Sequence, residues 1–436
     1  MKRHISQATT LFAGTVSVVA TWALSSTSLS AAPNAALRPG LRIQALPPEV
    51  NEARVRAHVM VPSNILGIES EEVRETRFKL PVLGKTFKVK PMLDVGEFGQ
   101  TIHAVLKDSV NGYMMQVHKN GTLVQTLQWN WAKVPADGNK GWKPSTRMHA
   151  ASVSKFLTAV GMVKTLDAKG ISYDTKIASY LPTYWNRGNN IDKITFRHLL
   201  THRSGFSTGG PSSDYNFMKT RVAAGVSGVG SYDYENMNFG LCRILIPIIN
   251  GNIPKNATFL FGNLNDNAWD AITVDNFRKY MQTNVFTPAG VSKVGFAPVA
   301  ALPRALAYEY LKTPAKGWDS GNLASMAGGA GWRLSVGELL RVMDHVRRRN
   351  TILPKAKTQY MLDNNFGIDQ IIDTPAGKTY NKNGLWRSNG RTEQCVAFFM
   401  PDNIEVAVFV NSKIGSGDGF SLRGIVQDAY VNSLSN

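Results

Sequence analysis

The stretch His149-Ala-Ala-Ser-Val-Ser-Lys155 stands directly before a run of apolar residues with helical spacing. Residues three and four positions apart share one face of a helix, and a glycine just beyond the last apolar residue is typical of a helix C-terminus. The apolar positions are Phe156, Leu157, Val160, Val163 and Leu166, and the glycine is Gly170. We therefore predict a helix from Ser152 to Asp167.

In this helix the side chains of Ser152 and Lys155 lie on one face, because they are three positions apart. A serine hydroxyl needs an adjacent base to act as a nucleophile, and a lysine serves when burial lowers its pKa toward neutrality. The free N–H groups at a helix start also favour a developing oxyanion. The pair alone fits a helix-capping serine and a solvated lysine better than a catalytic pair, so the rest of the chain decides its meaning.

The first residues of the chain have the pattern of a signal peptide. Lys2 and Arg3 precede an apolar stretch from Leu11 to Leu24, and small residues follow it. The stretch is too short for a membrane-spanning helix. We expect residues 1–32 to be a cleaved signal peptide and the protein to be periplasmic or secreted.

Composition indicates a globular protein of enzyme size. The chain has 436 residues, of which 43% are hydrophobic and 18% charged, and its net charge is +18. The basic residues are scattered without a basic stripe interleaved with aromatic residues, so we expect no nucleic-acid partner. Anionic cell-envelope polymers remain a candidate partner class. Cys242 and Cys395 are the only cysteines, which permits a single disulfide without predicting one.

Strand patterns gather at the two ends of the chain beyond residue 96. A helix at 96–109 precedes strands at 112–118 and 122–128, which are joined by an Asn-Gly turn, a strong hairpin signal. Strands at 391–399 and 404–410 precede a closing helix at 422–434. The helices that we expect between these ends are 195–200, 238–249, 273–284 and 335–348.

This arrangement predicts an α+β fold. Strands from the N- and C-terminal parts form one antiparallel sheet flanked by helices, and a mainly helical region at roughly 170–325 is inserted between them. Residues 33–95 are treated as an N-terminal extension with a short strand-like run at 85–89, and residues 96–436 as the main domain.

The stretch around Ser152 and Lys155 resembles the nucleophile motif of the serine β-lactamase-related superfamily. This superfamily includes class C β-lactamases, D-alanyl-D-alanine peptidases and related esterases, so the resemblance implies a β-lactamase/transpeptidase-like fold. Three further segments resemble it in the same order, namely residues 194–205, 286–290 and 326–331.

The second motif of that family is Tyr-x-Asn, and Tyr234-Glu-Asn236 matches it in position. Tyr-x-Asn also occurs at Tyr184 and Tyr430, but only Tyr234 lies between the segment 194–205 and an apolar helix. The resemblance implies that Tyr234 shuttles protons and that Asn236 orients the acyl chain of the substrate.

The third motif, Lys-Thr-Gly or a variant of it, is matched by Lys382-Asn-Gly384. The resemblance places Lys382, Asn383, Gly384 and Leu385 in substrate binding, with the N–H groups of Leu385 and Ser152 forming an oxyanion hole. Asn383 departs from the usual Thr or Ser, which puts in doubt the contact that this hydroxyl makes with a substrate carboxylate. The same letters at Lys119-Asn-Gly121 belong to the predicted hairpin turn.

Two rival sites are weaker. His198 and His202 have a spacing that can bind zinc, but the glutamate of His-Glu-x-x-His is missing, so we expect buried or capping histidines and no metal or cofactor. Gly205-Phe-Ser207-Thr-Gly209 has the letters of a nucleophile elbow, but no strand pattern precedes it, so we expect Ser207 to be a loop residue.

The sequence therefore predicts a serine hydrolase with Ser152 as nucleophile, Lys155 as base and Tyr234 as proton shuttle, acting on a small-molecule or peptide substrate. The bond is an ester, amide or β-lactam bond, and Asn383 favours an esterase or amidase. The alternatives are a D-alanyl-D-alanine carboxypeptidase or class C-like β-lactamase, and a non-catalytic envelope-binding protein on the same fold.

Overall fold

The computed structural model describes residues 44–47, 49–57, 76–79, 89–208, 212–309, 316–415 and 421–435. The predicted signal peptide and nearly all of the strand-like run at 85–89 lie outside these residues, and the domain boundaries given above stay predictions. Within the described ranges, no helix has both the length and the apolar character needed to cross a membrane.

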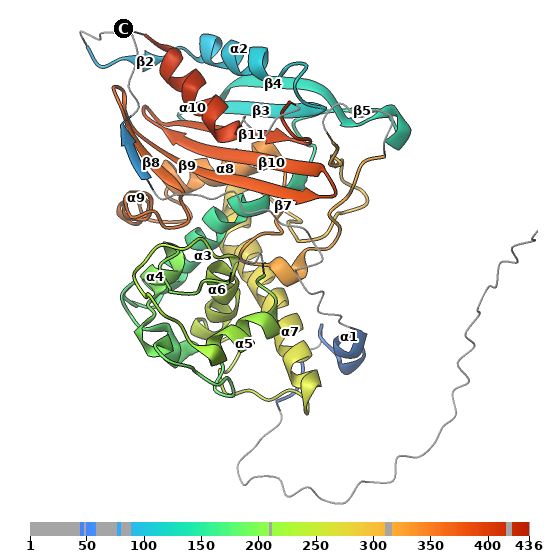
Figure 1. Ribbon diagram of the computed structural model, residues 1–436, viewed down its shortest axis with the longest axis vertical. Helices are drawn as coiled ribbons and strands as arrows, with labels where there is room; N and C mark the ends of the chain where they lie inside the picture. The colour runs from blue at the N-terminus through green and yellow to red at the C-terminus, as the bar shows by residue number, and fades with distance from the viewer. Residues whose placement is uncertain are drawn as a thin grey trace, which may run out of the picture. The chain divides into compact units, whose positions relative to one another are not determined.

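One eight-stranded sheet runs in the order β1-β8-β9-β10-β11-β3-β4-β5 (Figure 1). The strands are β1 (Thr76–Lys79), β3 (Gly112–Lys119), β4 (Thr122–Lys133), β5 (Lys140–Gly141), β8 (Gln370–Thr374), β9 (Gly377–Ser388), β10 (Arg391–Met400) and β11 (Ile404–Val410). Neighbours are antiparallel except β1 and β8, which are parallel. Because β3 pairs with β11, strands from the two ends of the chain share one sheet, and the predicted fold class is confirmed.

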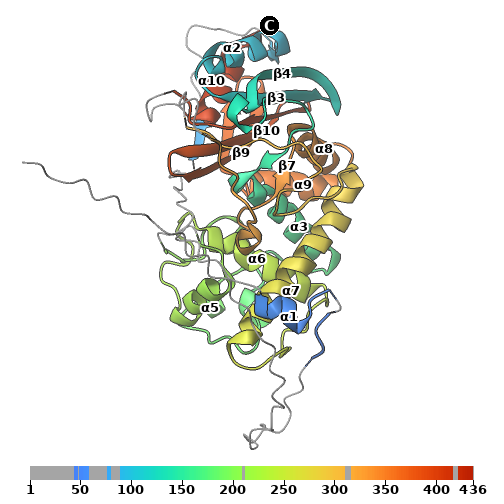
Figure 2. The same ribbon diagram turned by 90° about the vertical axis from the view of Figure 1, so that its right-hand side faces the viewer.

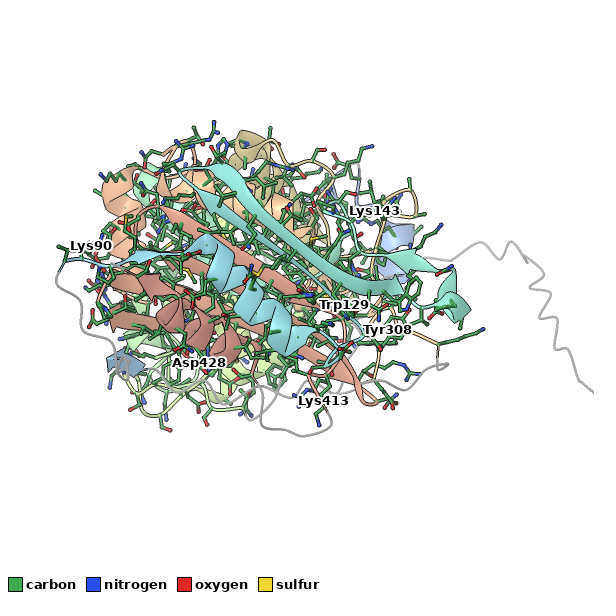
Figure 3. All side chains as sticks on the ribbon, turned by 90° about the horizontal axis from the view of Figure 1, so that it is seen from above. Lys90, Trp129, Lys143, Tyr308, Lys413 and Asp428 are labelled. Atoms are coloured by element: carbon green, nitrogen blue, oxygen red, sulfur yellow. The ribbon has the colours of Figure 1, made fainter. Side chains whose placement is uncertain are left out.

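Successive side chains along each strand point to opposite faces of the sheet, and both faces are apolar. On β11, Val406, Val408 and Val410 belong to one hydrophobic core, and Ala407 and Phe409 belong to the other. Helices α2 (Val95–Leu106) and α10 (Leu422–Asn432) cover the first face, as Figure 3 shows from above. Helices α8 (Val336–Arg347) and α3 (Ser154–Ala168) contribute to the second core, on the opposite face.

The β3–β4 hairpin confirms the prediction from its Asn-Gly pair. Asn120 and Gly121 have φ values of 53° and 74°, which a two-residue hairpin turn requires and which asparagine and glycine adopt most readily. The second Lys-Asn-Gly stretch, Lys119-Asn-Gly121, therefore forms the hairpin turn. Trp129, further along β4 and labelled in Figure 3, packs edge-on against His103 of α2.

The helical region lies beyond the second face of the sheet (Figures 1 and 2). Its helices are α4 (Phe196–Leu200), α5 (Tyr215–Ala224), α6 (Asn236–Ile249) and α7 (Asn263–Met281). Helix α7 begins ten residues before the predicted 273, because its first turns carry Asn and Asp residues that hide the apolar period. Helices α5 and α9 (Lys355–Asp363) were not predicted, since neither has a pronounced apolar face.

Short elements complete the fold at the chain ends and before α3. Helix α1 (Glu52–Ala57) packs on α7, β2 (Met92–Leu93) pairs with β12 (Leu434–Ser435), and β6 (Met148–His149) pairs with β7 (Arg333–Leu334). Cys242 on α6 and Cys395 on β10 are both buried and free, so the single disulfide that the composition permitted does not form.

Candidate active site

Ser152 lies in a single 3-10 turn, Ala151–Val153, that leads into α3. The turn closely follows β6, and between the two the Ala150 N–H donates to the carbonyl of Trp332 over 2.8 Å. Ala151 has a φ of 40°, a region that residues with a Cβ rarely adopt. Backbone strain of this kind clusters at functional sites, and here it directly precedes the only half-buried residue of the turn, Ser152.

Lys155 is the best-enclosed cation of the site, with no exposed surface. Its Nζ donates to Ser152 Oγ over 3.0 Å, to the carbonyl of Gly329 over 2.8 Å and to Asn236 Oδ1 over 2.5 Å. Burial lowers the pKa of Lys155 well below its ordinary value of 10.5, and the nearby charge of Lys382 lowers it further. The lysine is therefore suited to receive a proton from Ser152.

Tyr234 stands between the two lysines. Lys155 Nζ lies 4.9 Å and Lys382 Nζ 5.1 Å from the centre of its ring, and Lys382 Nζ is 3.4 Å from its hydroxyl. The ring stacks on His202 with 4.3 Å between centroids. The Glu235 N–H donates to His202 Nδ1 over 3.1 Å, and burial lowers the pKa of His202 well below its ordinary value. A neutral His202 thus supports the ring without adding a third charge.

The glycine turn at 326–331 closes the site behind Lys155. The hydroxyl of Thr158 on α3 donates to the carbonyl of Gly328 over 2.7 Å. Gly328 has a φ of 94°, and a Cβ there would lie 2.2 Å from the carbonyl oxygen of Phe239, so only glycine fits. Because this turn lies close to α3 and α6, the carbonyl of Gly329 is within hydrogen-bond distance of Lys155 Nζ.

The third motif lies on β9. Lys382 Nζ donates to Asp369 Oδ1 over 2.6 Å, and the Asn383 N–H donates to Asp369 Oδ2 over 2.9 Å. A Cβ on Gly384 would lie 2.9 Å from the Ala150 carbonyl oxygen and 3.1 Å from the Val153 N. The strand therefore passes directly against the turn of Ser152, and half-buried Leu385 follows on the same strand.

Gly384→Ala is expected to destabilise the fold, because the added Cβ meets backbone atoms of the Ser152 turn and the Cys395 Sγ at 2.6 Å. Overpacking of this kind costs about 1–3 kcal/mol, measurable by urea unfolding. Gly295→Ala is the matched control, since a Cβ there meets nothing within 4 Å. Equal stability of the two variants would contradict the close approach of β9 to the turn.

Two buried partners of the site were missed from the sequence. His149 Nδ1 lies 3.1 Å from Glu393 Oε2, and its Nε2 accepts the Gly331 N–H over 3.0 Å, so this histidine joins β10 to the glycine turn. Burial lowers the pKa of His149. The second missed partner is Asp369. Residues 370–381 form an antiparallel hairpin of β8 and β9, which places Asp369 beside Lys382. Prediction of this hairpin from the sequence would have identified Asp369 as a partner of the site.

The rival residues have structural roles. His198 forms the capping box of α4 with Thr195, and His202 is buried beneath Tyr234, which confirms the predicted capping and buried roles. Ser207 is an exposed loop residue, as expected. Tyr184 bonds to the hydroxyl of Tyr215, and Tyr430 belongs to the core under α10. The described residues hold no group of three or more His, Cys, Asp or Glu side chains that could bind a metal ion.

A family profile described as Beta-lactamase matches residues 98–251 of the chain, which include Ser152, Lys155, Tyr234 and Asn236. The solved structures with the same fold include penicillin-binding-protein relatives and an amidase. The match covers about a third of the chain, and together with these structures it shows that the chain has the fold of the serine β-lactamase-related superfamily. A search of curated protein sequences found no match.

Three solved structures of this superfamily fold illustrate the likeness. An octameric penicillin-binding protein homologue from Pyrococcus abyssi is 18% identical, with a TM-score of 0.58 over 77% of this chain and 76% of that one. FmtA from Staphylococcus aureus is 14% identical, with a TM-score of 0.59 over 80% and 93%. The D-amino acid amidase from Ochrobactrum anthropi SV3 is 15% identical, with a TM-score of 0.57 over 77% and 99%. Identities this low establish the fold alone.

Proposed function

We propose that the protein is an exported serine hydrolase that cleaves an ester or amide bond through an acyl-enzyme on Ser152. The observation that carries this proposal is the contact of 3.0 Å between Lys155 Nζ and Ser152 Oγ, made by a lysine that has no exposed surface and a lowered pKa. A capping serine with a solvated lysine would leave that amine in water. The match of residues 98–251 to the Beta-lactamase family and the shared fold are consistent with serine hydrolase activity on amide or β-lactam bonds.

In the proposed first step, Ser152 Oγ bonds to the carbonyl carbon of the substrate and its proton passes to Lys155 Nζ. The bond to the leaving group then breaks, and Tyr234 donates the proton that the leaving group takes up, recovering one from Lys155. Asn236, which accepts a hydrogen bond from Lys155, supports the amine and orients the acyl chain. The oxyanion rests on the N–H groups of Ser152 and Leu385.

In the second step, water attacks the acyl carbon and gives up its proton to the same Tyr234 and Lys155 pair. The bond to Ser152 Oγ breaks, and the serine recovers its proton. The balance is one water consumed for one ester or amide cleaved. The step needs no metal or cofactor.

The substrate class is tested by assaying p-nitrophenyl butyrate, nitrocefin and a D-alanyl-D-alanine peptide in parallel on the purified protein. We expect ester hydrolysis to exceed nitrocefin turnover by about tenfold or more in kcat/KM, because Asn383 lacks the hydroxyl that would hold a β-lactam carboxylate. Fast nitrocefin turnover without ester hydrolysis would replace the proposal by a class C-like β-lactamase. Peptide turnover alone would replace it by a carboxypeptidase.

Export and an envelope location remain part of the proposal, supported by the N-terminal pattern of charge and apolar residues. The net charge of +18 makes anionic envelope polymers a candidate partner. A non-catalytic binding protein is the second candidate, and it predicts that a fluorophosphonate adds no mass to the folded protein.

A further inference from the structure

The ammonium group of Lys382 already has a carboxylate partner inside the protein. Asp369 Oδ1 accepts from Lys382 Nζ over 2.6 Å, and the two side chains are 2% and 3% exposed. The second oxygen of Asp369 accepts the Asn383 N–H over 2.9 Å. Asp369, which directly precedes β8, therefore binds both the ammonium group and the backbone of the third motif.

This pairing changes what the motif can offer to a substrate. A cation that binds a substrate carboxylate needs an open charge, because burying a second carboxylate beside a neutralised ion pair has a desolvation cost with little Coulomb gain. Lys382 is instead enclosed, and it reaches Tyr234 at 3.4 Å rather than solvent. Its remaining role is to orient Tyr234.

Two neighbours complete the surroundings of this pair. Arg423 NH1 lies 3.8 Å from Asp369 Oδ2, farther than the 2.6 Å contact with Lys382, so Asp369 pairs chiefly with Lys382. Asn383, 7% exposed, stands where the family motif has a hydroxyl residue. In the third motif, therefore, the Lys382 ammonium is paired with Asp369, and the hydroxyl that could bind a substrate carboxylate is replaced by the Asn383 amide.

We propose that Asp369 determines substrate specificity, by neutralising Lys382 so that the site selects acyl substrates whose leaving group is uncharged and disfavours those whose leaving group carries a carboxylate. This inference rests on the proposed function and narrows it to neutral esters and amides. Peptides that are cleaved before their C-terminal residue, and β-lactams, have a leaving group that carries a carboxylate. The inference therefore places both outside the preferred substrates.

The test compares two esters of the same acid, one with a 3-carboxyphenyl and one with a 3-carbamoylphenyl leaving group. The two leaving groups have nearly the same shape and differ by one negative charge. In the wild-type protein at pH 7, we expect kcat/KM for the carboxamide ester to equal or exceed that for the carboxylate ester. In Asp369→Asn, the ratio should shift toward the carboxylate ester by about tenfold or more, because Lys382 and Arg423 lose their shared counter-charge.

Two control variants separate specificity from structure. Asp373→Asn removes the same charge four residues away, from a half-buried position on β8, and should leave the ratio unchanged. Asp369→Glu keeps the charge and should keep the wild-type ratio. The wild-type ratio alone tests the proposal if Asp369→Asn does not fold.

Three results would overturn the inference. A wild-type preference of tenfold or more for the carboxylate ester would show an available charge. An equal loss on both esters in Asp369→Asn, with the ratio unchanged, would make Asp369 a purely structural residue. Turnover of neither ester by the wild-type protein would remove the proposed function and this inference with it, which distinguishes the two failures.

Discussion

Ser152→Ala is expected to lower kcat/KM on any hydrolysed ester by about 10⁴-fold or more, because removal of the nucleophile leaves only binding and electrostatic stabilisation. The variant should fold, since Lys155 Nζ keeps its bonds to Asn236 and Gly329. Initial rates and thermal unfolding of the same preparation measure both quantities.

The matched control is Ser207→Ala, which removes a hydroxyl from the exposed loop that carries the rival motif. This variant should keep the wild-type rate. Normal turnover by Ser152→Ala, or a comparable loss in Ser207→Ala, would transfer the nucleophile to another residue.

Lys155→Met is expected to reduce kcat/KM by about 10³-fold and to remove the acidic limb of its pH profile. The base must be neutral to receive a proton, so the wild-type kcat/KM falls as pH drops through the pKa of Lys155. Because that pKa is lowered well below 10.5, the plateau of activity extends far below the pH at which an ordinary lysine becomes neutral. A profile of kcat/KM against pH measures the limb directly.

Lys169→Met provides the control, since Lys169 is an exposed lysine at the C-terminal cap of the same helix. Its profile should match the wild type in height and shape. An acidic limb that persists in Lys155→Met would mean that another group is the base.

Half of the strands of the sheet, β3, β4, β10 and β11, could be predicted because their signals are local. The β3–β4 hairpin and the β10–β11 hairpin are each contained in about twenty residues. The strands β1, β5 and β8 were missed because they are short, and the pairing of β1 with β8 joins segments almost three hundred residues apart. Burial by distant partners, rather than local periodicity, defines such strands.

The candidate site divides in the same way. Ser152, Lys155, Tyr234, Asn236 and Lys382 belong to short motifs in a recognisable order, and the structure brings them together. Asp369 and Glu393 have no such motif. Each is a single acidic residue that becomes meaningful only when a strand places it beside a buried lysine or histidine. An unfolded chain gives no sign of which of its 31 acidic residues will be enclosed.

The assignment of Ser152 as the nucleophile is tested most directly by peptide mapping of the protein after reaction with a fluorophosphonate. The account predicts one adduct per molecule, located on the peptide that contains Ser152, and no adduct in Ser152→Ala. An adduct on Ser207 with none on Ser152, or a folded protein whose mass does not change, would contradict it.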